Sequence, residues 1–114
     1  MNLERREIRT GLVTLELVGA ITMGRDCELL EQEVNDLLSQ GTRQVILDLG
    51  AVQRVDSAAI GKIVACFSRV RGAGGTMRVA CGQGTVREVL RMTQVDQILG
   101  LYPTAQAAQE SLAS

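Results

Sequence analysis

The sequence predicts a small α/β protein with one mixed sheet of four to five strands, packed with about four helices. Segments in which apolar and polar residues alternate are followed along the chain by segments whose apolar residues recur at helical spacing, and this order repeats. Strand–helix–strand units of this length require parallel pairing with right-handed crossovers, whereas the Thr10-Gly11 pair predicts an initial β-hairpin. The 114 residues, 46% of them hydrophobic, suffice for one compact core. We therefore expect a single domain over residues 1–114.

The first half is predicted to contain the hairpin, a long helix and a buried strand. Residues 3–9 form a charged strand suited to a sheet edge, and residues 12–18 alternate cleanly. Residues 25–40 carry an apolar stripe at helical spacing, with Gly41 as the stop. The segment QVILDLG, residues 44–50, is nearly all apolar, which is typical of a strand buried on both faces. A loop is expected after it.

The second half is predicted to continue the alternation of helices and strands. A helix is expected over residues 57–71, a short strand over 76–81 and a short helix over 85–92. Residues 95–102 are an apolar stretch that includes a short strand, and residues 105–112 form a capped C-terminal helix built from strong helix formers.

The composition argues against catalysis. The chain has no histidine, which excludes Ser-His-Asp and Cys-His mechanisms and most zinc sites. Its three cysteines are widely spaced and suit buried apolar positions better than a disulfide framework or a metal site. Lys62 follows Ser57 by five residues rather than three, so the Ser-x-x-Lys pattern of some acyl enzymes is absent. We expect no enzyme, no metal and no cofactor.

Charge and hydropathy narrow the class of partner. The formal net charge is -1, the basic residues are scattered, and Phe67 and Tyr102 are the only aromatic residues, so the pattern for nucleic-acid binding is missing. No apolar run approaches the roughly 18 residues of a membrane span, and the N-terminus lacks the apolar segment of a signal peptide. We expect a soluble cytoplasmic protein that binds no nucleic acid and does not insert into a membrane.

Two glycine-rich segments invite comparison with phosphate-binding loops. GAGGTM lies between a predicted helix and a predicted strand, which is the wrong order for such a loop. CGQGTVR runs from strand to helix, but Arg87 stands at the third glycine position and no lysine follows. Turn glycines explain both segments better, and weak nucleotide binding at the second one stays open.

The most informative segment is VILDLGAVQRVDSAAIGKIV, in which Asp56-Ser57 opens a helix after the buried strand. Serine is a favoured helix N-cap, which is the simplest interpretation of Ser57. Its neighbours Ala58, Ala59 and Gly61 are unusually small. They would leave a smooth surface on which another protein could close over the hydroxyl, or they would let the helix pack close to the sheet.

The whole pattern resembles the STAS family (sulphate transporter and anti-sigma factor antagonist), especially its free-standing bacterial members. The resemblance covers essentially the full chain and is carried by LVGAITMG, VILDLGAVQRVDSAAIG, RGAGGTMRVA and the tail REVLRMTQVDQILGLYPTAQAA. The Asp-Ser-x-x-x-Gly pattern after a Leu-Asp-Leu strand is its most specific part, and the other segments support it by order and spacing.

This resemblance implies a function. In the family, the serine after aspartate is phosphorylated by a kinase that doubles as an anti-sigma factor; the unphosphorylated form binds that kinase and frees the sigma factor, and a phosphatase resets the cycle. Carried over, the chain is an anti-sigma factor antagonist that regulates transcription by partner switching. Ser57 is the phosphoacceptor and Asp56 positions the hydroxyl or the kinase contact. The implied partner-binding residues are Asp56, Ser57, Ala58, Ala59, Ile60 and Gly61.

The chain also departs from the family pattern. Many antagonists carry an acidic pair before the first helix, in a Gly-Glu-Leu-Asp turn, where this chain has GAIT with Ala20 and Thr22. Ala59 stands where glycine is common.

Two other functions stay open beside the antagonist: a non-switching STAS subunit of a lipid-transport ATPase complex, and a scaffold in a larger signalling assembly.

Overall fold

The sheet has five strands in the order β1-β2-β3-β4-β5, with β1 antiparallel to β2 and the other neighbours parallel. The computed structural model describes residues 1–112, so residues 113–114 of the predicted domain lie outside the described part. The elements are β1 (Asn2–Arg9), β2 (Leu12–Ile21), α1 (Arg25–Ser39), β3 (Gln44–Val55), α2 (Ser57–Gly72), β4 (Thr76–Ala80), α3 (Thr85–Met92), α4 (Val95–Leu99), β5 (Leu101–Tyr102) and α5 (Ala105–Ser111). The predicted fold class, a hairpin followed by alternating strands and helices, is confirmed.

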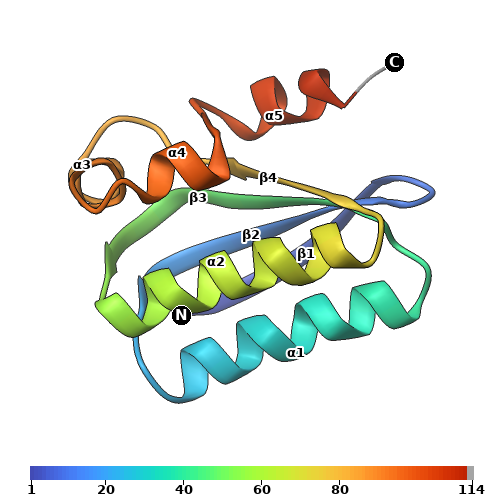
Figure 1. Ribbon diagram of the computed structural model, residues 1–114, viewed down its shortest axis with the longest axis horizontal. Coiled ribbons are helices and arrows are strands. Elements are labelled where there is room, and N and C mark those ends of the chain that lie inside the picture. Colours follow the sequence, from blue (N-terminus) through green and yellow to red (C-terminus); the bar gives the residue numbers. More distant parts are fainter. Residues whose placement is uncertain (113–114) are drawn as a thin grey trace.

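Helices cover the two faces of the sheet unequally. Figure 1 shows α1 and α2 side by side on one face and α5 on the other, while α3 and α4 lie towards one end of the strands. The larger apolar cluster fills the layer between the sheet and α1 and α2. A smaller cluster of Leu12, Ile46, Ala108 and Leu112 joins the opposite face to α5. The first half of β3 is therefore buried on both sides, as its apolar sequence predicts.

Strand β3 is longer than the sequence predicts. The expected loop after Gly50 is absent, because β3 continues to Val55 alongside an extended β2. The pairing irregularity beside Gly50 coincides with a local turn in which the Gly50 N–H donates to Asp48 Oδ1 at 2.9 Å. Most side chains of the extension are exposed or half-buried, so no run of apolar residues marks it as strand. Backbone hydrogen bonding to β2 holds these residues in a strand, although their side-chain pattern does not predict one.

The region over residues 95–102 also differs from the prediction. It splits into a one-turn helix, α4, and the two-residue strand β5, so the structure has five helices over residues 1–112 instead of about four. Val95 and Leu99 are both buried, and a four-residue spacing suits one face of a helix. Gly100 has φ of 65°, and this left-handed conformation ends the helix.

Helices α1 and α2 are joined on their solvent side by polar contacts. Lys62 Nζ donates to Glu31 Oε2 at 2.8 Å, and Arg69 Nη1 donates to Asn35 Oδ1 at 2.6 Å. These contacts join the two helices to each other, while the end of β3 at Val55 places the start of α2 at one end of the sheet. None of the helices within residues 1–112 combines the length and the hydropathy needed to cross a membrane.

Candidate functional site at the start of helix α2

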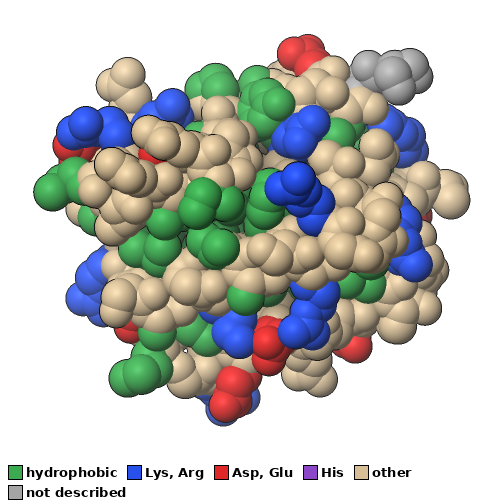
Figure 2. Space-filling model, viewed as in Figure 1, with side chains coloured by type: hydrophobic (Ala, Val, Ile, Leu, Met, Phe, Trp, Pro, Cys, Tyr) green, Lys and Arg blue, Asp and Glu red, His purple; other side chains and the backbone are tan. Residues whose placement is uncertain are grey.

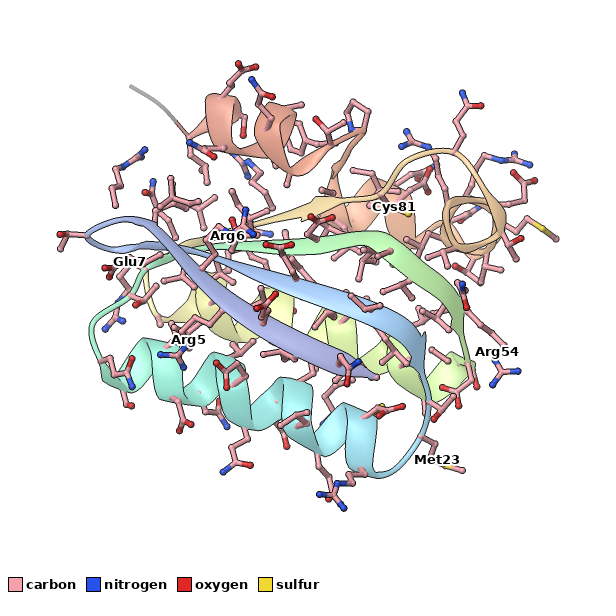
Figure 3. The ribbon with its side chains drawn as sticks, turned by 180° about the vertical axis from the view of Figure 1, so that it is seen from behind. Arg5, Arg6, Glu7, Met23, Arg54 and Cys81 are labelled. Carbon is pink, nitrogen blue, oxygen red and sulfur yellow. The ribbon has the colours of Figure 1, made fainter. Side chains whose placement is uncertain are left out.

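The two loops that form the candidate site meet because β2 and β3 are parallel. Their carboxyl ends lie at the same end of the sheet, so the turn at residues 22–24 before α1 lies beside the start of α2. The Asp56 N–H donates to the Ile21 carbonyl at 3.4 Å and ties the two strand ends together. Figure 3 shows Met23 and Arg54 projecting from this end of the molecule.

Asp56 holds both loops through its carboxylate. It is the N-cap of α2, where Oδ1 accepts from the Ala59 N–H at 2.8 Å, while Oδ2 accepts from the Met23 N–H at 2.9 Å. The N–H of Met23 and then that of Ala59 are the main causes that hold the pKa of Asp56 below its usual value. An ionised Asp56 therefore links the turn before α1 to the first turn of α2.

Ser57 does not cap the helix. The simplest sequence interpretation made its hydroxyl the N-cap, but Asp56 occupies that position and Ser57 is the first residue of α2. Aspartate and serine are comparable caps, so the pattern Asp-Ser does not reveal which of the two begins the helix. Ser57 is exposed to solvent. Its hydroxyl is thereby free for a role other than holding the helix end.

The other predicted docking residues divide between surface and core. Ala58 and Gly61 are exposed and Ile60 is half-buried, whereas Ala59 is 0% exposed and packs into the main core. The small side chain of Ala59 therefore lets the first turn of α2 pack close to the sheet. Of the predicted partner-binding residues, those on the outer side of that turn are the ones that solvent reaches.

Gly61 has no structural requirement within this chain. A Cβ added at Gly61 would meet no other atom within 4 Å, and the backbone there has ordinary helical φ. Glycine inside a helix costs about 1 kcal/mol relative to alanine. The position therefore gives up helix stability without a packing reason among residues 1–112, which fits a surface that another molecule approaches closely.

Apolar side chains extend this surface along α2. Ile60, Val64 and Phe67 recur at helical spacing and are half-buried against the core. Helix α4 contacts α2 and contributes Ile98, which is 53% exposed. Figure 2 shows hydrophobic side chains gathered between these two helices. An apolar strip thus runs along α2, the helix that begins at Ser57, on the side where α4 contacts it.

Sequence reasoning missed Met23, which is 75% exposed. Thr22 and Asp26 shape the turn that presents it: the N–H and the hydroxyl of Thr22 both donate to Asp26 Oδ2 at 3.0 Å. The only signal in the sequence is an apolar residue followed by Gly24 directly before a predicted helix. The spacing of apolar residues does not predict whether a single turn residue is exposed, so the exposure of Met23 could be recognised only in the tertiary structure.

The second glycine-rich segment lines a separate cavity of about 470 Å³ between the ends of β3 and α3. Arg87, the cation beside it, donates to the Cys81 carbonyl at 2.6 Å and so supports the loop itself. Gly84 precedes α3 with φ of 146°, a conformation that favours glycine. In the first segment, a Cβ on Gly75 would lie 2.3 Å from the Arg43 carbonyl oxygen. Backbone geometry therefore accounts for Gly75 in the first segment and for Gly84 in the second.

The cysteines are core residues, and Cys27 also donates from Sγ to the Thr22 carbonyl, in the turn before α1, at 3.3 Å. Cys27, Cys66 and Cys81 are buried and unpaired. Burial is the main cause that raises the pKa of each thiol, to about 11 for Cys66. They are therefore thiols rather than thiolates at neutral pH and serve as small core residues, as the sequence predicts.

Comparison with known proteins identifies the family. A family model described as the STAS domain matches residues 5–108. The chain belongs to the STAS domain family. A Thermotoga maritima protein with the provisional name of anti-sigma factor antagonist is 28% identical to this STAS domain over 78 residues, which cover 68% of this chain and 69% of the relative.

Solved structures extend the similarity to nearly the whole chain. The crystal structure of a Thermotoga maritima protein, also provisionally named an anti-sigma factor antagonist, superposes with a TM-score of 0.84 at 25% identity and covers 96% of this chain and 92% of that one. The Bacillus cell fate determinant SpoIIAA in its phosphorylated form superposes with a TM-score of 0.75 at 16% identity, over 98% of this chain and 100% of that one. At that identity the second similarity concerns the fold alone.

Proposed function

We propose that this STAS domain is an anti-sigma factor antagonist whose binding to an anti-sigma factor with serine kinase activity ends when Ser57 is phosphorylated. The observation that carries the proposal is the division of labour at the start of α2. Asp56 caps the helix and joins it to the neighbouring turn, while Ser57 stands exposed at the first helical position. Such a hydroxyl can be modified without removing a structural contact.

The fold should tolerate a phosphate on Ser57. Phosphorylation adds about -1.5 to -2 charges at neutral pH. The ionised carboxylate of Asp56, directly before Ser57, is a like charge that opposes the phosphate, whereas the first turn of α2 itself contains no acidic residue. The positive end of the helix dipole favours an anion here by about 0.3–2 kcal/mol. Folding free energy is therefore expected to change little.

Partner binding should not tolerate the same charge. Ala58, Gly61 and the half-buried Ile60 offer a close, weakly polar contact surface around the hydroxyl. At the centre of an interface a phosphate must lose its water without gaining a partner. The cost is about 2–5 kcal/mol, which corresponds to a roughly 30- to 4,000-fold loss of affinity. Binding is then switched while the fold is kept.

The proposed cycle involves three other proteins: the anti-sigma factor, a sigma factor and a phosphatase. The unphosphorylated chain binds the anti-sigma factor and frees a sigma factor for transcription; the anti-sigma factor, acting as a kinase, phosphorylates Ser57 and releases the chain; a phosphatase restores the hydroxyl. The chain itself acts by binding and not by catalysis. This cycle takes place in the cytoplasm, where sigma factors act.

Affinity capture with three baits tests the proposal. Wild type, Ser57→Glu and Ser39→Glu are immobilised, exposed to lysate of the source cell, and the captured proteins identified by mass spectrometry. Ser39 ends α1 at the opposite end of the molecule and is exposed, so its variant adds the same charge away from the candidate site. We expect a histidine-kinase-like ATPase on wild type and Ser39→Glu, and its loss on Ser57→Glu.

A second step shows that the captured ATPase is the kinase. Purified ATPase should transfer phosphate from ATP to wild type and not to Ser57→Ala. Equal capture of a transporter ATPase or of a scaffold protein by all three baits would instead support permanent docking and overturn the switch. So would phosphate transfer to a residue other than Ser57.

A further inference from the structure

Met23 lies beside the proposed phosphoacceptor and is not part of the protein's own core. Its N–H donates to the carboxylate of Asp56, the residue directly before Ser57, so the backbone of Met23 is held against the start of α2. Its side chain is 75% exposed. An isolated exposed apolar residue is ordinary on a protein surface. At Met23, however, hydrogen bonding fixes the backbone next to a proposed contact residue, so the side chain emerges where a partner would bind.

Arg54 adds a charge to the same end of the molecule. It lies in the extension of β3 three residues before Ser57, its side chain is exposed, and no carboxylate within residues 1–112 pairs with it. Figure 3 shows Arg54 and Met23 pointing outward from this end. An exposed cation and an exposed apolar side chain thus flank the start of α2.

Two of the acidic residues near this surface, Asp56 and Asp26, have internal roles. Both carboxylate oxygens of Asp56 accept backbone N–H groups, from Met23 and from Ala59. Asp26 accepts from Thr22 through Oδ2 and faces the N-terminal amine through Oδ1 at 3.5 Å. These two carboxylates are therefore directed into the turn. The exposed charged residues left near Met23 are Arg54, Arg25 and Glu28, so the balance of exposed charge is positive.

We propose that Met23 and Arg54 form the specificity rim of the docking site, and that the anti-sigma factor kinase that fits it presents an apolar pocket flanked by acidic side chains. This inference rests on the proposed function above and names the chemistry of its partner. An apolar anchor in a pocket supplies affinity. The arginine favours acidic surfaces and disfavours basic ones, which selects among kinases and speeds association.

The test uses the purified kinase that phosphorylates Ser57 and measures its dissociation constant by calorimetry for five variants, of which Met23→Leu serves as the conservative replacement. Met23→Ala and Arg54→Glu alter the rim. Met92→Ala is the matched control for the first, because Met92 is 71% exposed on α3. Arg71→Glu is the control for the second, because Arg71 is exposed in the last turn of α2, about 20 Å along the helix from Ser57.

We expect Met23→Ala to weaken binding by about tenfold, the loss typical of an anchoring side chain. Met23→Leu should restore most of it, since leucine keeps the apolar contact. Arg54→Glu should weaken binding by about tenfold at low salt and much less near 0.5 M salt, where exposed charges are screened. Both controls should remain within about twofold of wild type, given the weak effect of residues outside an interface.

Three results would overturn the inference. If Met23→Ala or Arg54→Glu binds the kinase as tightly as wild type, and the kinase still phosphorylates Ser57 of the wild type, the rim is removed and the proposed function stays intact. Equal losses of affinity in Met92→Ala and Arg71→Glu would show that binding is non-specific and does not depend on a rim. A source cell with no kinase acting on Ser57 would overturn the proposed function and this inference with it. Melting curves of all variants show whether each remains folded.

Discussion

Helices α1 and α2 lie side by side on the same face of the sheet, yet their first turns differ in a way that separates stability from function. The first turn of α1 contains Asp26 and Glu28, which stabilise the positive end of its dipole. The first turn of α2 contains no acidic residue and has the helix-destabilising Gly61 close behind it. At the start of α2 the compensating charge is instead the N-cap Asp56, whose carboxylate also binds the turn before α1, and Ser57 follows it directly.

The outward faces of the two helices differ as well. The polar and apolar sides of α1 are more sharply separated than those of α2. Helix α2 instead carries three half-buried apolar residues further along the helix from Ser57: Ile60, Val64 and Phe67. The comparison suggests that α1 is selected for holding the fold, whereas part of α2 is kept for a partner. Four substitutions test this difference.

The largest expected effect is on binding and comes from Ser57→Asp. It should weaken binding of the anti-sigma factor kinase by about 30- to 4,000-fold, because a charge must be buried in the interface. The melting temperature should stay within about 4 °C of wild type, since the change at the helix start is below about 1 kcal/mol. Calorimetric titration and thermal unfolding measure the two quantities. A collapsed fold would make Ser57 a structural residue and reverse the assignment.

Leu30→Ala should show the opposite behaviour. Leu30 is 0% exposed in α1, and its truncation leaves a cavity that costs about 2–5 kcal/mol of unfolding free energy. Affinity of the fraction that stays folded should match wild type. Urea unfolding followed by circular dichroism gives the loss of stability. Weaker binding by the folded fraction would show that α1 contributes to the interface and blur the contrast between the helices.

Asp56→Ala should affect both properties, because Asp56 joins α2 to the turn that carries Met23. Loss of the cap and of the second acceptor should lower the melting temperature and weaken kinase binding. The native pKa of Asp56 is lowered, so its stabilising contribution is present above the unfolded pKa of about 3.9. It is lost as pH falls through the lower native value.

The difference in melting temperature between wild type and Asp56→Ala should therefore be constant near neutral pH and shrink in acid. Thermal unfolding from pH 7 to pH 2 measures it. A difference that persists unchanged at the acidic limit would mean that the carboxylate's charge has no part in holding the two loops.

The smallest effect is expected from Gly61→Ala, where stability and binding should move in opposite directions. Alanine should raise the unfolding free energy by about 0.5–1 kcal/mol, since the added methyl meets no atom of the chain. It should also weaken kinase binding several-fold by obstructing close approach. Chemical denaturation and titration check the two signs. Unchanged affinity would place Gly61 outside the interface.

Much of the fold could be predicted because it follows from local pattern. The apolar run at residues 44–50, the stripe of α1 and the short connection between the first two strands each report their own element. Strand–helix alternation then restricts the topology to parallel pairing. The extension of β3 to Val55 could not be predicted in this way, because its exposed residues are held in a strand by pairing with β2 and not by burial.

The candidate site shows the same boundary between local and long-range information. The pattern Asp-Ser at the opening of a helix is a local signal, and by itself it favoured a helix cap at Ser57, which is wrong. The resemblance to the STAS family singled out Ser57 as the phosphoacceptor, which stays a prediction. Three features needed the tertiary structure: the assignment of the cap to Asp56, the burial of Ala59, and the position of Met23 thirty-three residues earlier in the chain, beside Asp56. Periodicity describes how a segment relates to itself. Hydrogen bonds between loops exist only once two parallel strands end at the same edge of the sheet.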